Sequence, residues 1–223
     1  MKSTPRNCSA VNSAAGLPSR RGECSDALNL QASTTGTDMP GREIVIGVTG
    51  GIAAYKAADI VSTLRQKGYG VTVVMTEFAQ EFVGPLTFRT LSDRPAVTGW
   101  SMDGADHAPQ HISLARLADV MLIAPCTANI IGKIAHGIAD DILTTTVLSV
   151  TCPVVIAPAM NKDMYRNPAV QDNLALLKKR GVQMVEPEEG FLACGEVGMG
   201  RLADTARIVE TVERLAQAEK KGK

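Results

Sequence analysis

Short apolar runs alternate with segments of helical spacing from Arg42 onward, and this alternation constrains the fold more than any other feature of the sequence. The apolar, largely β-branched runs predict strands at 43–49, 71–75, 120–124, 153–157 and 182–186. Apolar residues that recur on one helical face predict helices at 52–67, 77–83, 128–137, 138–148, 169–180 and 206–218. Strands that alternate with helices form a parallel sheet covered on both faces. We therefore expect an α/β fold, a single doubly wound (Rossmann/flavodoxin-like) parallel sheet with helices on both faces.

The first 40 residues lack this pattern. They are rich in Ser, Thr, Asn, Gly and Pro and contain no aromatic residue. A segment of this composition cannot bury enough apolar surface to offset the entropy that ordering would cost. The sequence therefore predicts a disordered N-terminal extension over 1–40, a folded domain over 41–219 and a short basic tail over 220–223.

Charge and cysteine usage exclude several classes of partner and site. The 23 Lys and Arg residues balance the 23 Asp and Glu residues, so we expect neither nucleic acid nor an anionic membrane as a partner. No apolar stretch approaches the roughly 18 residues that a membrane span needs. The five cysteines include no C-x-x-C pair, which disfavours a disulfide framework or zinc site and favours a reducing, cytoplasmic location. His107 and His111 are separated by Pro109, which breaks the helix that a metal-binding pair would need, so no metal is expected.

Small and polar residues follow the predicted strands at the points where those strands end. Residues 50–51 follow the first strand, Thr76 the second, 125–129 the third, 158–161 the fourth and 193–201 the fifth. The carboxyl ends of parallel strands meet at one edge of a sheet, and ligands of open α/β sheets bind at that edge. The pattern predicts a ligand site there but does not identify the ligand.

Two features of this edge favour a mononucleotide over a dinucleotide. Gly50 and Gly51 open a helix, where backbone N–H groups can approach an anion such as a phosphate. A nicotinamide dinucleotide would need an acidic residue at the end of the second strand to hold its ribose, but Thr76 occupies that position. The sequence therefore favours FMN over NAD. Arg201, in a Gly-rich segment predicted to be a mobile flap, could pair with a phosphate or carboxylate.

Four segments of the chain resemble the flavin-dependent cysteine decarboxylase (HFCD) superfamily. They are Gly50–Lys56 (GGIAAYK), His111–Asp119 (HISLARLAD), Pro158–Tyr165 (PAMNKDMY) and Ala193–Arg201 (ACGEVGMGR). The last segment is typical of enzymes that act on phosphopantothenoylcysteine. The chain therefore resembles most strongly the phosphopantothenoylcysteine decarboxylases, from Arg42 to Ala218.

The resemblance implies an enzyme, an FMN-dependent carboxy-lyase of coenzyme A biosynthesis. Its substrate would be 4′-phosphopantothenoylcysteine, and its products 4′-phosphopantetheine and CO2. FMN would oxidise the substrate thiol to a thioaldehyde, which accepts the electrons released with CO2, and would then return the hydride. His111 would be the base in thiol oxidation, Asn161 would hold the leaving carboxylate, and Cys194 would supply a proton in the final reduction.

The same resemblance assigns further residues to the site. The expected FMN contacts are Gly50, Gly51, Ile52, Thr76, Thr127, Ala128, Asn129 and Ala159. The expected substrate contacts are Asn161, Met164, Ala193, Gly195, Gly200 and Arg201. Two positions depart from the family pattern, because Ile130 replaces a hydroxyl residue of the P-A-S-A-N-T loop and Tyr165 replaces a Trp.

The resemblance also implies partners and leaves alternatives. We expect a homotrimer, or a dodecamer built of trimers, with FMN sites at subunit interfaces. A separate phosphopantothenate–cysteine ligase is expected, because the chain ends before such a domain. The alternatives are a peptidyl-cysteine decarboxylase, a flavin prenyltransferase and a non-catalytic FMN-binding regulatory subunit. The segment 193–201 argues against the first two, and the presence of His111, Asn161 and Cys194 favours an enzyme over the third.

Overall fold

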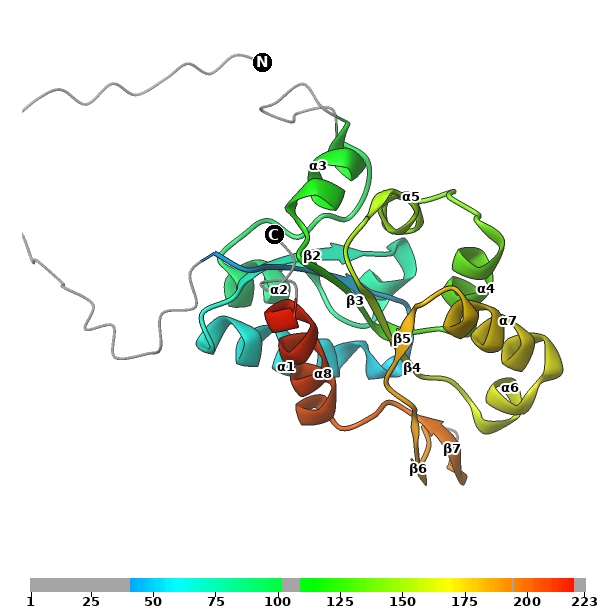
Figure 1. Cartoon of the computed structure of the whole chain (residues 1–223). Coiled ribbons are helices and arrows are strands. Elements are labelled where there is room, and N and C mark those ends of the chain that lie inside the picture. The colour runs from blue at the N-terminus through cyan, green and yellow to red at the C-terminus, as the bar shows by residue number, and fades with distance from the viewer. Residues whose placement is uncertain (1–40, 102–108, 194, 219–223) are drawn as a thin grey trace, which may run out of the picture. The chain divides into compact units, whose positions relative to one another are not determined.

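A five-stranded parallel sheet forms the centre of the computed structural model, which describes residues 41–101, 109–193 and 195–218 (Figure 1). The strands lie in the order β2-β1-β3-β4-β5, which is the flavodoxin-like order of doubly wound folds. Their bounds are β1 (Glu43–Val48), β2 (Gly70–Met75), β3 (Val120–Cys126), β4 (Val154–Pro158) and β5 (Gln183–Met184). The predicted α/β fold is confirmed. The extension predicted over 1–40 and the tail predicted over 220–223 lie outside the described residues.

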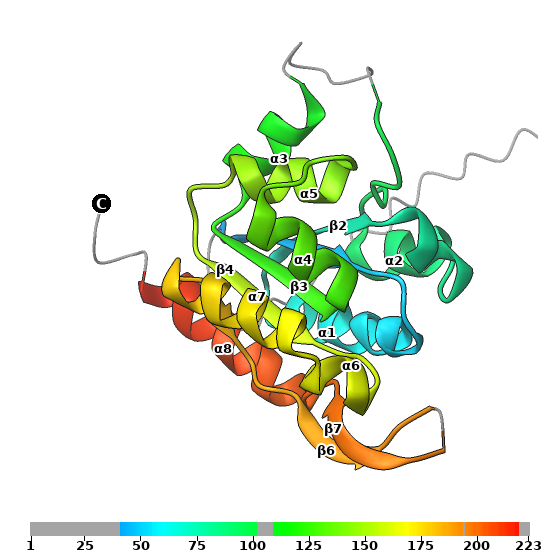
Figure 2. The same ribbon diagram turned by 90° about the vertical axis from the view of Figure 1, so that its right-hand side faces the viewer.

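Helices cover both faces of this sheet (Figure 2). One face carries α1 (Lys56–Gln66), α2 (Pro85–Ser92) and α8 (Thr205–Ala218). The other face carries α3 (Gln110–Leu117), α4 (Ala128–His136), α5 (Ile142–Ser149) and α7 (Pro168–Lys179). The shorter helices are η1 (Ile52–Tyr55), η2 (Glu77–Glu81) and α6 (Lys162–Arg166), of which η1 and η2 are 3-10 helices. No helix within the described ranges is long and apolar enough to cross a membrane.

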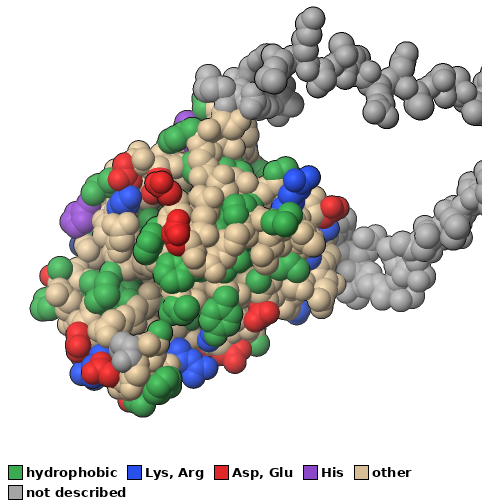
Figure 3. All heavy atoms as spheres, turned by 180° about the vertical axis from the view of Figure 1, so that it is seen from behind, with side chains coloured by type: hydrophobic (Ala, Val, Ile, Leu, Met, Phe, Trp, Pro, Cys, Tyr) green, Lys and Arg blue, Asp and Glu red, His purple; other side chains and the backbone are tan. Residues whose placement is uncertain are grey.

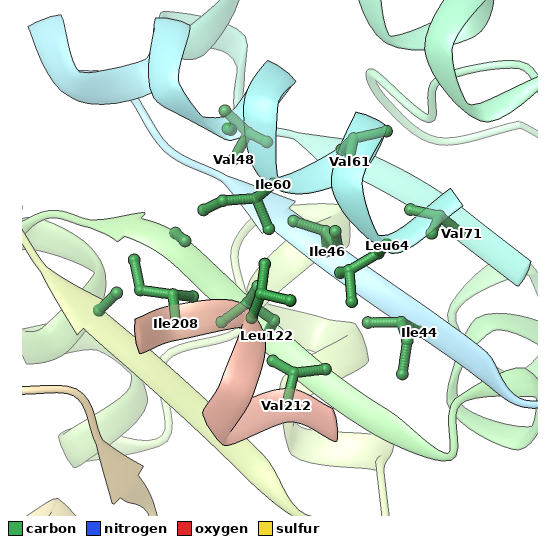
Figure 4. Packing of buried hydrophobic residues seen from close by; sticks show 14 of the residues in the cluster. Ile44, Ile46, Val48, Ile60, Val61, Leu64, Val71, Leu122, Ile208 and Val212 are labelled. Carbon is green, nitrogen blue, oxygen red and sulfur yellow. The ribbon is translucent and has the colours of Figure 1, made fainter. Parts of the chain in front are cut away.

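Two hydrophobic cores lie on opposite faces of the sheet, because successive strand residues point in opposite directions. In β1, Ile44 and Ile46 pack into the core beneath α1 and α8 (Figure 4), whereas Val45 packs into the core beneath α4 and α5. In β3, Leu122 and Ile123 divide between the two cores in the same way. Full burial of one such side chain stabilises the fold by about 1.5–3 kcal/mol. Burial on both faces explains why these strands read as continuous apolar runs.

Several elements differ from the sequence-based predictions. The helix expected over 138–148 begins at Ile142, because the Asp141 carboxylate caps it by accepting the Thr144 N–H at 2.7 Å. The strand expected over 182–186 is limited to β5, and Pro187, which lacks an N–H, follows soon after. The helices α2, α3 and α6 are not predicted by the apolar spacing.

A separate two-stranded hairpin follows β5. Its strands, β6 (Glu188–Phe191) and β7 (Val197–Arg201), pair antiparallel, and Figures 1 and 2 show them beside α6, away from the main sheet. The prediction of a Gly-rich loop is wrong over 197–201, where Gly198 and Gly200 are buried and alternate with exposed residues. Pairing with β6, a contact that composition does not reveal, makes this segment a strand.

Candidate active site

A cavity of about 1080 Å³ opens at the carboxyl edge of the sheet. It is lined by residues that follow β1, β2, β3 and β4 and by residues of the β6–β7 hairpin. Ligand pockets commonly measure about 300–1,000 Å³, so this cavity has room for a cofactor together with a substrate. The predicted site residues that line it are Gly50, Gly51, Ile52, Thr76, Thr127, Ala128, Asn129, Ala159, Asn161, Met164, Ala193, Gly200 and Arg201. The fold therefore brings these residues together, as the positions of the strand ends predict.

The ends of β1 and β3 are linked by a hydroxyl group that the sequence analysis does not single out. Thr49 is fully buried and lies directly after β1. Its Oγ1 donates to the carbonyl oxygen of Pro125 at 2.7 Å and accepts the N–H of Thr127 at 3.2 Å. Thr127 is the N-cap residue of α4. The hydroxyl of Thr49 therefore positions the start of α4 at the cavity.

The turn after β1 packs closely against Phe78 of η2 and lies beside the start of α4. A Cβ atom on Gly50 would lie 2.9 Å from the backbone carbonyl carbon of Phe78 and closer still to that side chain. A Cβ on Gly51 would meet the Thr127 methyl group at 3.6 Å, an ordinary contact. The N–H groups in the first turn of α4, next to Thr127, have no partner within their own helix and attract anions. The residues present thus fit a phosphate-bearing mononucleotide such as FMN.

Asn161 lies at the opposite side of the same sheet edge, after β4. Its Oδ1 accepts the N–H of Asp163 at 2.8 Å, so the side chain caps α6. This bond fixes the orientation of the amide in a residue that lines the cavity. The amide nitrogen is a donor of the kind that holds a carboxylate.

The β6–β7 hairpin lies directly against the segment that leads to Asn161. The Met160 N–H donates to the carbonyl oxygen of Gly200 at 2.9 Å. Gly200 has a φ of +134°, and a Cβ there would collide with the carbonyl oxygen of Met160. The side chain of Arg201 lies over Gly190, where a Cβ would be 2.9 Å from its Cδ and Nη1 atoms. Glycine at both positions lets β7 and the Arg201 side chain pack closely at the cavity.

A charged cluster that the sequence analysis does not predict also lines the cavity. Lys133 Nζ lies 2.7 Å from Asp140 Oδ1 and 3.4 Å from Asp141 Oδ2. The hydrogen bond from Lys133 lowers the pKa of the Asp140 carboxyl, and the same bond raises the pKa of Lys133. Both groups are therefore charged at neutral pH. The three residues meet because the chain turns between α4 and α5, and no sequence spacing signals that contact.

Three predicted residues are not placed at the cavity. His111, in the first turn of α3, does not line it; its ring packs edge-to-face on Trp100, with ring centroids 5.7 Å apart. The Nδ1 atom of His111 is buried and has no hydrogen-bond partner among the described residues. Gly195 does not line the cavity either. Cys194 lies outside the described residues, as does His107.

The two departures from the family pattern have different environments. Ile130 is buried and lines the cavity, so an apolar side chain stands there in place of a hydroxyl group. Tyr165 does not line the cavity, and its hydroxyl donates to Glu186 Oε2 at 3.3 Å. Burial, with a smaller contribution from Glu186, raises the pKa of Tyr165. Among residues 41–101, 109–193 and 195–218, no three His, Cys, Asp or Glu side chains are grouped to hold a metal ion.

Comparison with known proteins gives a consistent result. The family model described as Flavoprotein matches residues 32–217. The coenzyme A biosynthesis bifunctional protein CoaBC of Bacillus subtilis (strain 168) is 49% identical over 173 residues, which are 78% of this chain and 43% of that protein. The chain thus spans less than half the length of this relative. A probable phosphopantothenoylcysteine decarboxylase of Streptococcus mutans is 44% identical over 174 residues, which are 77% of this chain and 97% of that protein.

Solved structures show the same likeness. A mutant of PPC decarboxylase complexed with pantothenoylaminoethenethiol is 30% identical, with a TM-score of 0.69, and the match covers 78% of this chain and 97% of that one. The FMN-dependent cysteine decarboxylase SpaF is 36% identical, with a TM-score of 0.70, and the match covers 79% of this chain and 97% of that one.

Proposed function

The chain belongs to the flavoprotein family, and from this premise we propose that it is an FMN-dependent phosphopantothenoylcysteine decarboxylase, a carboxy-lyase of coenzyme A biosynthesis. The reaction converts 4′-phosphopantothenoylcysteine into 4′-phosphopantetheine and CO2. One observation carries the proposal: a single cavity joins the glycine turn after β1, Asn161 and the hairpin that bears Arg201. The likeness to a phosphopantothenoylcysteine decarboxylase along nearly its whole length supports this substrate.

The residues after β1 and β3 hold the flavin in this proposal. FMN supplies a hydride acceptor for oxidation of the substrate thiol and a hydride donor for the later reduction. The first turn of α4, over 128–129, would hold its phosphate with backbone N–H groups, and Gly50 and Gly51 line the same cavity. The buried Thr49 hydroxyl fixes the position of the segment after β1 relative to the segment after β3.

The residues after β4 and in the hairpin bind the substrate. Asn161 holds the leaving carboxylate through its amide nitrogen, and the α6 cap keeps that amide in one orientation before substrate arrives. Arg201 pairs with an anionic group of the substrate. Cys194, between Ala193 and Gly195, supplies the proton for the final reduction. The hairpin helps to exclude water from the reacting atoms.

His111 acts in this proposal from a neighbouring subunit of a homotrimer or larger assembly. It does not line the cavity of its own chain, although its buried Nδ1 has no partner among the described residues. Ile52, Tyr55 and Phe78 line the cavity yet are more than half exposed. Hydrophobic side chains are spread over the face seen in Figure 3. The exposed apolar side chains grouped at the cavity mark a contact site, so a second copy that covers them can also bring His111 to the flavin.

Two further proposals concern the cellular setting. A phosphopantothenate–cysteine ligase, which makes the substrate, is the expected partner. The cytoplasm is the expected location, because the five cysteines include no C-x-x-C pair.

The test is incubation of the purified, FMN-loaded protein with 4′-phosphopantothenoylcysteine, followed by mass spectrometry. We expect loss of CO2 and formation of 4′-phosphopantetheine. Absorbance of bound flavin is measured in the same sample, so that an empty protein is not mistaken for an inactive one. Unchanged substrate in the presence of bound FMN would contradict the proposal.

A peptide that ends in cysteine, as for the peptidyl-cysteine decarboxylase alternative, is the second candidate substrate, and the chain is also 36% identical to the FMN-dependent cysteine decarboxylase SpaF. The same assay separates the two candidates when each substrate is supplied alone. Turnover of the peptide without turnover of phosphopantothenoylcysteine would establish the second candidate. The likeness to a probable phosphopantothenoylcysteine decarboxylase over 97% of that protein favours the phosphorylated substrate.

A further inference from the structure

The start of α6 and strand β7 are in unusually close contact. A Cβ on Gly198 would lie 2.9 Å from both Cβ and Cδ of Lys162, so the aliphatic stem of Lys162 lies flat on β7 where no side chain intervenes. Two residues further along β7, the carbonyl oxygen of Gly200 accepts the Met160 N–H at 2.9 Å. The residues on either side of Asn161 therefore both contact β7.

The charged end of Lys162 extends this contact to the tip of the hairpin. Lys162 Nζ lies 3.2 Å from Glu196 Oε2. Glu196 closes the turn between β6 and β7, because its carbonyl oxygen accepts the Leu192 N–H at 2.8 Å, and the Gly195 N–H donates to Leu192 at 2.9 Å. The ion pair thus connects the residue after Asn161 to the turn that joins Leu192 to Gly195 and Glu196, and Leu192 and the adjacent Ala193 line the cavity.

We propose that Lys162 is a positioning residue, which holds the hairpin turn over the cavity at a fixed place relative to Asn161. The inference rests on the proposed function and adds a residue to which no role in the site is assigned above. The stem of Lys162 sets the distance between α6 and β7, and its ammonium group sets the position of Glu196. A turn that is already ordered when substrate arrives does not have to be ordered by the substrate, so binding is stronger.

The solvent exposure of Lys162 and Glu196 sets how strongly loss of their ion pair affects the turn. The side chains of Lys162 and Glu196 are 25% and 50% exposed, so their ion pair is screened and contributes modestly. We expect loss of the ion pair to increase the fraction of molecules in which the turn has moved away from the cavity by about two- to fivefold. If the binding-competent state becomes less populated, KM for substrate rises by up to that factor while kcat is unchanged.

The experiment compares three variants with the wild-type protein: Lys162→Met, Glu196→Gln and the charge-reversed pair K162E/E196K. Lys162→Met keeps the apolar stem and removes the charge. Lys178→Met is the matched control, because Lys178 forms an exposed ion pair with Glu186 at 3.6 Å, outside the cavity lining. The first readout is amide hydrogen exchange of residues 188–201 in the FMN-loaded protein, which needs no activity. The second is the KM and kcat for 4′-phosphopantothenoylcysteine.

We expect faster amide exchange and a raised KM in both single variants. The reversed pair should return the exchange rate and KM to their wild-type values, and Lys178→Met should leave both unchanged. Amide exchange equal to wild type in Lys162→Met would overturn the proposal. Faster exchange with an unchanged KM would also overturn it, as would a reversed pair whose exchange rate and KM do not return to wild-type values. Failure of the proposed function is recognised separately, because the wild-type protein would then not turn over the substrate. In that case the exchange data alone decide whether Lys162 orders the turn.

Discussion

Thr49 links the ends of two neighbouring strands through a single buried hydroxyl group. It donates to Pro125 and accepts from Thr127, and both partners lie beside the cavity. A buried hydrogen bond contributes modestly to stability while it is made, but leaving its partners unpaired costs more. One side chain at this place therefore affects both the stability of the sheet edge and the geometry of the flavin site.

Replacement of Thr49 by Val keeps the shape of the side chain and removes the hydroxyl. We expect the free energy of unfolding to fall by about 1–3 kcal/mol, because the Pro125 carbonyl and the Thr127 N–H lose their buried partner. Urea unfolding of the two proteins measures the difference, and flavin fluorescence reports a weaker FMN complex. Thr90→Val is the control, since the Thr90 hydroxyl donates to Leu86 at an exposed site. Equal losses in both variants would show that the Thr49 hydroxyl has no special role.

The β6–β7 hairpin is anchored at its base by one carboxylate. Glu188 Oε1 accepts the Asp204 N–H at 3.1 Å and lies 3.0 Å from Arg207 Nη1 at the start of α8. The backbone hydrogen bond from Asp204, followed by the interaction with Arg207, lowers the pKa of the Glu188 carboxyl. The hairpin is thus attached to the main domain at Glu188, and at Gly200 to Met160, which lies before α6.

A lowered pKa makes the anchor depend on pH in a defined direction. The folded protein favours ionised Glu188, so its stabilising effect is present above the usual glutamate pKa of 4.5 and is lost as pH falls through the lowered value. We expect Glu188→Gln to be less stable than wild type by about 0.5–1 kcal/mol at pH 7, because the carboxylate is partly exposed. The difference shrinks as pH falls below 4.5 and through the lowered pKa of Glu188.

Unfolding curves of wild type and Glu188→Gln, recorded between neutral and acid pH, measure this difference. The neighbouring Glu189 is exposed on the same strand, and Glu189→Gln is the control. A difference that stays constant with pH would mean that ionisation of Glu188 does not stabilise the hairpin.

His111 lies away from the cavity of its own chain, and an assembly of several copies accounts for this position. The cavity of one chain holds Asn161 but not His111. In the proposed assembly, each site combines Asn161 of one copy with His111 of another. Such a shared site predicts that two inactive variants can restore activity to each other.

Co-assembly of His111→Asn and Asn161→Ala chains tests this arrangement. Each variant alone is expected to be inactive. Random mixing at equal amounts leaves about a quarter of the sites with both wild-type residues, so about a quarter of wild-type activity should return. Differently tagged chains allow the mixed assembly to be isolated. No recovery in an isolated mixed assembly that retains FMN would place both residues in a site formed by one chain.

Local sequence determined the elements that depend on short-range patterns. Continuous apolar runs predict β1 to β4 because both faces of each strand are buried. The placement of Gly50, Thr127 and Asn161 at one cavity also follows from sequence, because the carboxyl ends of parallel strands share an edge. Neither prediction requires knowledge of a specific side-chain contact.

Tertiary structure alone decided the contacts between distant parts of the chain. The Thr49 hydroxyl bonds, the pairing of β6 with β7, and the ion pair of Lys162 with Glu196 join residues that no local pattern connects. The absence of His111 from the described cavity lining is of the same kind. Hydrophobic periodicity specifies which face of an element is buried, whereas the partner of a polar group depends on which segments folding brings within hydrogen-bond distance.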